Sequence, residues 1–271
     1  MKNSFQGSCA LVTGASSGLG EEFARQLAAR GANLVLTARS RAKLEVIAGE
    51  LTQAHGVRVE DVSSDLSEAW GVDELIGNVN SLGVEIDHLV NNAGFGLAGA
   101  FVDLDAGEQT RMLRLNCEAL LRLSRHFAPK FVEKRAGGII HVASTAGHQP
   151  MPFMATYGAT KAFVLSFSVA LAEELASANV RVMALCPGPV PTGFQAVAGI
   201  EPGMERVAAL SAKDTVARGI EAYEAGDFVC VPGAVNRVQT MISKLMPRRI
   251  VTHTVGQAMR RMGRAGKGPS E

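Results

Sequence analysis

Short apolar runs rich in β-branched residues alternate along the chain with longer stretches of helical periodicity. The short runs predict strands at residues 10–13, 34–37, 57–59, 88–91, 139–142, 180–185 and 228–231. The stretches between them predict helices over 18–30, 41–55, 68–81, 107–134 and 157–177. The strands are too apolar for a sheet with one wet face. We therefore expect an α/β fold, with a doubly wound parallel sheet of about seven strands and helices on both faces.

No Pro-, Gly- or Ser-rich linker interrupts this alternation before about Pro232. We predict one domain over 1–232 and a C-terminal extension over 233–271, partly helical and with a disordered end. The stretch 244–271 holds seven Lys or Arg against one acidic residue. Five apolar residues of this stretch lie near one face of a predicted helix: Ile250, Val251, Val255, Met259 and Met262. The pattern favours a helix that packs on its own subunit or a neighbour, and docking on a membrane surface is the weaker alternative.

Composition and charge exclude several classes of protein. The net charge of +1 gives no general attraction to nucleic acid or to a membrane. The four cysteines are scattered and form no C-x-x-C pair, which indicates free thiols in a reducing compartment. The first residues lack the apolar stretch of a signal peptide, and the apolar run at 162–172 is too short to span a bilayer. We therefore expect a cytoplasmic protein.

The histidines have no spacing typical of a metal site, and we predict none. His141 and His148 flank the segment after the fifth predicted strand. We expect these two side chains to line a pocket or to pack.

A glycine-rich segment, Thr13-Gly-Ala-Ser-Ser-Gly-Leu-Gly20, joins the first predicted strand to the first predicted helix. Gly14 allows a sharp turn off the strand, Gly18 allows backbone to approach a phosphate, and Gly20 allows close helix–sheet packing. The N-terminal amides and dipole of the helix then favour an anion. The segment predicts a Rossmann-type site for the pyrophosphate of a dinucleotide.

Tyr157 and Lys161 are four residues apart in a predicted helix, so their side chains share one face. A nearby ammonium favours the phenolate, and we expect it to lower a phenol pKa that is normally about 10. A tyrosine tuned toward neutrality can donate or accept a proton at a reacting oxygen.

The spacing of these motifs resembles that of the short-chain dehydrogenases/reductases. The resemblance rests on T-G-x-x-x-G-x-G at 13–20, N-N-A-G at 91–94, Y-x-x-x-K at 157–161 and P-G-x-x-x-T at 187–192. It implies hydride transfer between a nicotinamide and an alcohol or ketone. It also implies catalytic roles for Ser144, which lies thirteen residues before Tyr157, and for Asn116, which would distort the long helix and hold a water of the proton relay.

The resemblance also implies where the cofactor binds. Asp65 and Leu66 would contact the adenine, the segment 91–94 would flank the adenosine, and Pro187 to Thr192 would hold the nicotinamide carboxamide. The complete predicted cofactor-binding set is Gly14, Ser16, Ser17, Gly18, Leu19, Gly20, Arg39, Asp65, Leu66, Asn92, Ala93, Gly94, Tyr157, Lys161, Pro187, Gly188, Val190 and Thr192.

The end of the second predicted strand addresses the choice of cofactor. Ala38 stands where NAD-binding members carry an acidic residue that repels a 2′-phosphate. Arg39 follows at once, and a guanidinium can bond a phosphate in fork geometry. The hydroxyls of Ser16 and Ser17 could add donors. We expect a preference for NADP(H) over NAD(H), with ketone reduction as the working direction.

The substrate and the assembly are less defined. The candidate lining residues are mostly apolar, with no Arg or Lys placed to hold a carboxylate, which suggests a hydrophobic ketone. They are Phe95, Leu97, Met151, Phe153, Met154 and Phe194. The resemblance implies a mobile lid at about 193–213, and pairing of the two long helices into a homodimer or homotetramer. The alternative function is a non-catalytic dinucleotide sensor with the same fold, which a turnover assay would distinguish.

Overall fold

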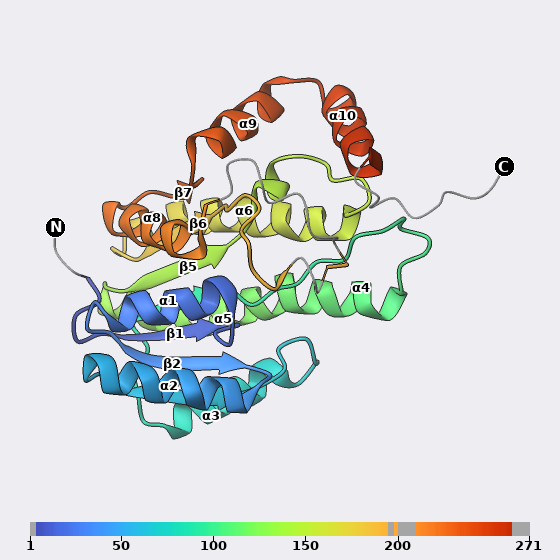
Figure 1. Ribbon diagram of the computed structural model, residues 1–271. Coiled ribbons are helices and arrows are strands. Elements are labelled where there is room, and N and C mark those ends of the chain that lie inside the picture. The colour runs from blue at the N-terminus through green and yellow to red at the C-terminus, as the bar shows by residue number, and fades with distance from the viewer. Residues whose placement is uncertain (1–3, 195–197, 200–209, 262–271) are drawn as a thin grey trace.

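Seven parallel strands form a single sheet in the computed structural model, which describes residues 4–194, 198–199 and 210–261 (Figure 1). The spatial order is β3-β2-β1-β4-β5-β6-β7, so the strand order reverses beside β1. The strands are β1 (Cys9–Thr13), β2 (Asn33–Ala38), β3 (Val59–Ser63), β4 (His88–Asn91), β5 (Gly138–Val142), β6 (Arg181–Leu185) and β7 (Val229–Cys230). The expected doubly wound α/β fold is confirmed.

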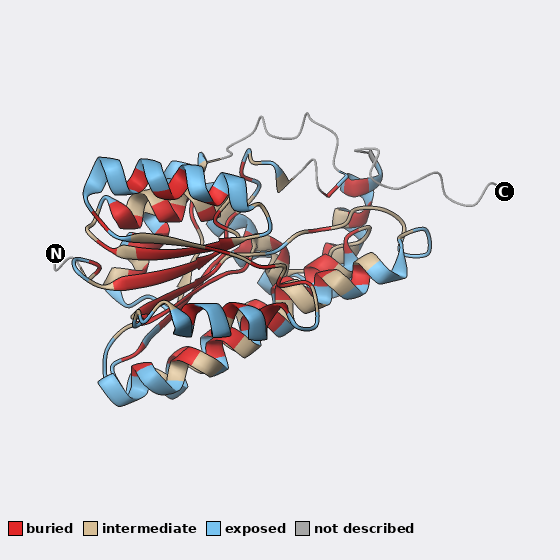
Figure 2. Cartoon of the chain, turned by 90° about the horizontal axis from the view of Figure 1, so that it is seen from below, coloured by how far each residue is buried: buried red, intermediate tan, exposed pale blue. Residues whose placement is uncertain are grey.

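Helices cover both faces of the sheet, and each face has its own apolar core. One core unites α1 (Gly18–Ala28), α2 (Arg41–His55) and α8 (Ala212–Ala225) with the strands. The other unites them with α3 (Gly71–Ser81), α5 (Leu120–Lys134) and α6 (Ala155–Ala176). Figure 2 shows the buried strands between these two layers.

Two elements differ most from the sequence-based prediction. The third strand lies at Val59–Ser63 and not at 57–59, because an edge strand with the polar residues Glu60 and Asp61 carries no apolar run. The helix predicted over 68–81 begins at Gly71, since the backbone amide of Glu68 donates to the Asp65 carbonyl in a turn.

The helix predicted over 107–134 is continuous in space but not regular. It consists of α4 (Ala106–Leu113), the π-helical turn η1 (Arg114–Ala119) and α5. The predicted distortion around Asn116 is thus present, because this residue lies inside the π-turn. A π-turn within an α-helix often marks a functional position.

Helix α6 is long and apolar enough, by composition, to cross a membrane, and it is the one such helix among the described residues. It is 22 residues long, longer than the apolar run at 162–172 that the sequence singles out. Yet it packs against β5 and β6 and buries Tyr157, Lys161 and Ser168 on the side of the sheet. These contacts are those of a core helix in a globular domain.

The C-terminal extension forms an arm of two helices, α9 (Ala234–Leu245) and α10 (Arg248–Arg261), which arch over α6 (Figure 1). On α10, Val251 and Met259 are buried and Val255 packs beside Met259, whereas Ile250 is half exposed. This is the packing on its own subunit that the sequence favours. Met262, the last residue of the predicted face, lies outside the described residues, and the domain boundary at residue 232 stays a prediction.

Two buried histidines lie on neighbouring strands of the sheet. His88 on β4 contacts Phe5 and the Tyr223 hydroxyl, which lies 2.9 Å from Nδ1. His141 on β5 is fully buried between the hydroxyls of Ser124 and Ser168, at 2.9 and 2.8 Å. Burial lowers the pKa of His88 to about 4 and that of His141 to about 3. Both imidazoles are therefore neutral in the folded protein at neutral pH.

We predict that the free energy of unfolding falls as the pH drops from about 6.5 toward 4. Unfolding returns both imidazoles to the ordinary histidine pKa, so in this range the unfolded chain binds more protons than the folded protein. Each histidine should contribute a slope of about 1.4 kcal/mol per pH unit. Urea unfolding between pH 7.5 and 5 measures this slope. His88→Gln should lower the slope by about 1.4 kcal/mol per pH unit, and the same change at exposed His55 should leave it intact; equal slopes in all three proteins would contradict the prediction.

Candidate active site

The glycine-rich turn after β1 forms a tight cradle. Gly14 and Gly18 adopt left-handed backbone conformations, with φ of +66° and +60°. A Cβ at Gly20 would overlap the Gly14 carbonyl oxygen, so the start of α1 lies directly against the turn. Ser17, the N-cap of α1, makes no capping hydrogen bond through its side chain. The first amides of α1 are therefore not capped by that hydroxyl, and the turn fits a phosphate group.

The ends of β1 and β4 are tied together at this cradle. The Thr13 hydroxyl accepts hydrogen bonds from the backbone amides of Asn92, at 3.0 Å, and Ala93, at 2.9 Å. The Asn92 side chain donates to the Thr13 carbonyl, also at 2.9 Å. Asn92 thus holds the two loops in register, whatever it contributes to the cofactor. Thr13 is a positioning residue absent from the predicted set, although it opens the motif that led to that set.

Ser144, Tyr157 and Lys161 come together between β5 and α6. Tyr157 and Lys161 are buried on one face of α6, and Ser144 follows β5. The Ser144 hydroxyl accepts from the Ala146 amide at 3.1 Å, and it lies beside the Tyr157 hydroxyl. The Lys161 ammonium donates to the Val142 carbonyl at 2.8 Å and lies 5.9 Å from the Tyr157 ring centroid. The sequence spacing therefore places the three side chains as expected.

The protonation of the pair differs from expectation. Burial raises the pKa of Tyr157 to about 12, and the hydrogen bond with Ser144 acts in the lowering direction. Burial lowers the pKa of Lys161 to about 8. The prediction that Lys161 lowers the phenol pKa of Tyr157 is therefore wrong for the protein alone. The cost of burying a phenolate dominates, and the ammonium is directed at a backbone carbonyl instead of the phenol oxygen.

Asn116 locks the loop after β4 against α6. Its Oδ1 accepts from the Phe95 amide at 3.1 Å, and its Nδ2 donates to the Phe95 carbonyl at 2.9 Å and to the Thr160 hydroxyl at 3.0 Å. A Cβ on Gly94 would come 2.9 Å from Asn116 Oδ1 and 3.5 Å from Lys161 Nζ. Gly94 thus leaves room beside both polar groups. The role of Asn116 toward a relay water stays a prediction.

The segment after β6 lies against the glycine-rich turn. A Cβ on Gly18 would come 3.3 Å from the Thr192 side chain, so the predicted pyrophosphate and nicotinamide segments adjoin. Pro187 and Val190 are buried, and the Pro187 carbonyl accepts from the Thr145 amide at 2.9 Å. A Cβ on Gly188 would press on the Asn236 side chain at the start of α9.

Asp65 takes part in a local turn at the predicted adenine end. Its Oδ1 accepts from the Ser67 amide and hydroxyl, and its Oδ2 lies 3.3 Å from the Arg111 guanidinium. Burial raises the pKa of its carboxyl, but the Ser67 hydrogen bonds and the charges of Arg39 and Arg111 outweigh this, and the pKa is lowered overall. Leu66 is buried in the core. Contact of these two residues with adenine stays a prediction.

Arg39 is exposed directly after β2, where Ala38 ends the strand. Its guanidinium has no carboxylate within ion-pair distance in the described part of the chain, whereas Arg41 pairs with Glu45 at 2.9 Å. Ser17 is exposed and Ser16 half-buried in the neighbouring turn. The three side chains thus offer donors, and no carboxylate, at this end of the cradle.

An apolar cluster surrounds Tyr157. All six predicted lining residues belong to it, and the Phe194 ring lies 5.4 Å from the Tyr157 ring between centroids. Met112 from α4 and Met259 from α10 complete it, and neither was predicted to line the site. A cation also stands at its edge, because the Arg260 guanidinium lies 5.7 Å from the Phe153 ring centroid. The predicted lid at 193–213 falls largely outside the described residues.

Neither singled-out histidine forms part of a metal site. The ranges that the structure describes contain no group of three His, Cys, Asp or Glu side chains able to hold a metal ion. His141 packs in the core, as described above. His148 lies beside Ser144 in the short helix η2 (Thr145–His148), and both its ring nitrogens are buried without a hydrogen-bond partner among the described residues.

Several known proteins are similar in sequence to this chain. A very-long-chain 3-oxoacyl-CoA reductase of Pyrenophora tritici-repentis is 35% identical over 181 residues, covering 65% of this chain and 53% of that protein. The chain thus spans about half the length of the curated reductases that it matches. An uncharacterised oxidoreductase of Bacillus subtilis is 34% identical over 205 residues, covering 76% of this chain and 75% of that protein.

Solved structures share the whole fold. A short-chain dehydrogenase from Sphingobium yanoikuyae, determined in complex with NADPH, superimposes with a TM-score of 0.79 at 31% identity, covering 89% of this chain and 96% of that one. The family model described as short chain dehydrogenase matches residues 8–201, a segment that contains the cradle, Ser144, Tyr157 and Lys161. The chain therefore belongs to the short-chain dehydrogenase family.

Proposed function

We propose that this protein is an oxidoreductase that transfers a hydride between a nicotinamide cofactor and a carbonyl or secondary alcohol. The observation that carries the proposal is the convergence of Ser144, Tyr157 and Lys161 beside Gly94, within reach of the apolar cluster. A bound nicotinamide dinucleotide would supply the hydride chemistry. The cradle of Gly14 to Gly20 and the segment Pro187 to Thr192 would hold it.

The side chains divide the remaining work. The Tyr157 hydroxyl, protonated at neutral pH, donates its proton to the oxygen of a ketone as that oxygen gains charge. The Ser144 hydroxyl hydrogen-bonds to the same oxygen and orients it. The Lys161 ammonium, 5.9 Å from the centre of the Tyr157 ring, would stabilise the resulting phenolate by its charge, although burial disfavours the charged form of both groups. Asn116 keeps the Phe95 backbone and Thr160 in place around them.

The substrate that fits this surrounding is a hydrophobic ketone. The apolar side chains of Phe95, Met154 and Phe194 gather around the Tyr157 ring. Relatives named very-long-chain 3-oxoacyl-CoA reductases and a neighbour described as a bulky-bulky ketone specific alcohol dehydrogenase agree in chemical class. Arg260 at the edge of the cluster would suit a substrate with an anionic group at a distance from its ketone.

A non-catalytic dinucleotide sensor is the less favoured function. A sensor needs the cradle but not an acid poised at the substrate. Here the structure also brings Ser144, which is not part of the predicted cofactor-binding set, to the hydroxyl of Tyr157.

NADP(H) is the cofactor that the adenosine end favours. Arg39 makes no ion pair within the described residues, although its charge acts on the Asp65 carboxyl, and Ala38 carries no charge, so a 2′-phosphate at the end of β2 would meet the guanidinium without an acid at position 38. The neighbour from Sphingobium yanoikuyae was solved with NADPH, but one from Brucella melitensis was solved with NADH, so relatives support a nicotinamide cofactor of either kind.

We also propose that the protein self-associates and that it is located in the cytoplasm. Large apolar side chains are exposed on the adjoining helices of one sheet face: Leu113, Leu121 and Val132 on α4 to α5, and Phe163 and Val169 on α6. Such a face favours a homodimer or homotetramer.

The four cysteines are free thiols, and burial raises the pKa of each, as expected for unreactive thiols in a reducing cytoplasm.

Tyr157→Phe should lower the turnover of a hydrophobic ketone by roughly two to four orders of magnitude, because it removes the proton donor. Cofactor affinity, measured by nucleotide fluorescence titration, should change little. Tyr223→Phe is the matched control, since it removes the hydroxyl of the only other tyrosine, which lies at His88. The assignment is wrong if the Tyr157 variant turns over the ketone as fast as the control.

Ala38→Asp combined with Arg39→Ile should shift the ratio of kcat/KM for NADPH over NADH toward NADH by about 10- to 100-fold, the loss expected for one charged hydrogen-bonding contact. Steady-state kinetics with both cofactors measures the shift. Arg41→Ile, which removes an exposed arginine paired with Glu45, should leave the ratio unchanged. Equal efficiency with both cofactors in the unmodified protein would rule out the proposed preference.

Light scattering at micromolar concentration should give a mass of two or four times 28.5 kDa. Phe163→Asp, which places a charge on the exposed face of α6, should lower the mass toward that of one chain. Val46→Asp at the exposed apolar residue of α2 serves as the control and should not. A monomer in the unmodified protein would refute self-association.

A further inference from the structure

Helix α9 has its polar and apolar faces reversed relative to an ordinary covering helix. The residues turned toward the body are polar: Thr240 is buried, and Asn236 and Ser243 are half-buried. Asn236 lies against Gly188, and the helix contacts the turn at Thr145–His148. The apolar residues point outward instead. A helix that only covered the domain would turn its apolar face inward.

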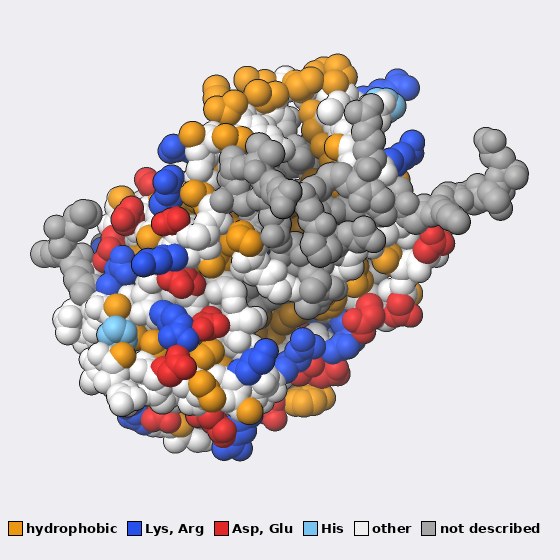
Figure 3. Space-filling model, viewed as in Figure 1, with side chains coloured by type: hydrophobic (Ala, Val, Ile, Leu, Met, Phe, Trp, Pro, Cys, Tyr) orange, Lys and Arg blue, Asp and Glu red, His pale blue; other side chains and the backbone are white. Residues whose placement is uncertain are grey.

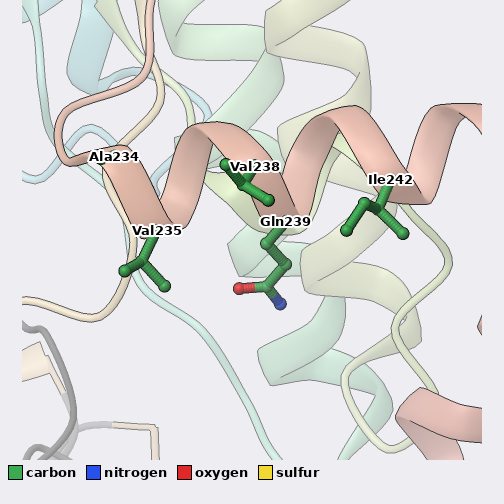
Figure 4. Close-up of a pocket in the computed structure, with 5 residues that line it drawn as sticks. All are labelled: Ala234, Val235, Val238, Gln239 and Ile242. Atoms are coloured by element: carbon green, nitrogen blue, oxygen red, sulfur yellow. The ribbon is translucent and has the colours of Figure 1, made fainter.

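The outward face is a continuous apolar ridge, defined here as Val235, Val238, Met241, Ile242, Leu245 and Met246. Each is exposed, and Leu245 reaches 77%. The first five are spaced three or four residues apart, which places them on one side of the helix, and Met246 follows at its C-cap. An open hollow of about 450 Å³ is lined by Val235, Val238, Gln239 and Ile242. Figure 4 shows these side chains along α9. In Figure 3 hydrophobic side chains run along the outer edge of the molecule at this position. Ile250 at the start of α10 continues the exposed apolar surface.

The charges around the ridge have a single sign. Arg237 and Lys244, seven residues apart, line one edge of it, and Arg248 and Arg249 follow at its end; all four are exposed. From 228 to 270 the chain contains no Asp or Glu at all. An apolar helical face whose bordering charges are all basic, beside the neutral Gln239, is the pattern of a helix that lies in the interface of an anionic bilayer.

We propose that the ridge on α9 docks this protein on the surface of a membrane that contains anionic lipids. The basic residues would contact the head groups, and the ridge would enter the boundary between head groups and acyl chains. A second copy of the chain is a poorer occupant. An antiparallel two-fold pairing of α9 with itself would bring Arg237 and Lys244 toward their own copies, with no acid in the arm to offset them. The face exposed for self-association lies elsewhere, on α4 to α6.

The test is co-sedimentation of the full chain with vesicles. Binding is expected with phosphatidylcholine vesicles that contain one third phosphatidylserine and not with phosphatidylcholine alone, and it should weaken at high salt. Ile242→Ser with Leu245→Ser should lower the partition coefficient about tenfold or more. Arg237→Gln with Lys244→Gln should lower it about fivefold per charge. Val46→Ser, an exposed apolar residue of α2 at the far side of the domain, should bind like the unmodified chain.

Thermal unfolding and light scattering on the same proteins complete the test. The four proteins should melt at similar temperatures, because the substituted side chains are exposed. Three results would overturn the proposal: no binding of the unmodified chain, equal binding to both vesicle types, or unchanged binding of the ridge variant. A lower mass of the ridge variant in the absence of vesicles would assign the ridge to a second copy and would overturn it as well.

Discussion

The reversal of strand order at β1 is the constraint from which the site follows. Because β2 lies on one side of β1 and β4 on the other, the chain leaves the carboxyl ends of β1 and β4 toward opposite faces of the sheet, and a crevice opens between them. The Thr13 hydroxyl fixes the two ends by accepting the amides of Asn92 and Ala93. The next strands bring Ser144 and Thr192 to the same edge. The topology thus assembles residues that lie more than 170 positions apart in the chain.

Desolvation sets the chemistry of the assembled groups. Tyr157 and Lys161 are each buried, and burial moves both pKa values toward the neutral forms. The site at rest therefore holds a protonated phenol and a lysine that titrates within reach of physiological pH. A positive charge brought by a ligand would act on the phenol most strongly here, because few solvent dipoles remain to screen it. The pKa values of Tyr157 and Lys161 therefore depend more on the charge of a bound ligand than on bulk solvent.

Sequence reasoning succeeded where one local rule decided the outcome. Periodicity located the central strands, glycine chemistry located the cradle, and a four-residue helical spacing placed Tyr157 beside Lys161. It failed where the outcome depended on distant partners. The edge strand β3 has no apolar run to mark it, and the sign of the Tyr157 shift depends on total burial. The sequence pattern placed Met259 on an apolar helical face. Nothing in the pattern indicated that this face packs in the cluster around Tyr157. The outward ridge of α9 likewise requires knowledge of which side faces the body.

The three glycines of the cradle carry a consequence for how such a turn can change during evolution. Each is confined by a different segment: Gly14 by Asn92 and Ala93, Gly18 by Thr192, and Gly20 by the Gly14 carbonyl. A side chain gained at one of them could be accommodated only if its neighbour moved or shrank at the same time. Single substitutions at Gly14 and Gly20 are therefore strongly disfavoured, and changes in the turn are coupled to the loops that hold Asn92 and Thr192, about 80 and 175 residues away in the chain. The sequence of this short motif near the N-terminus is in this way constrained by two remote loops.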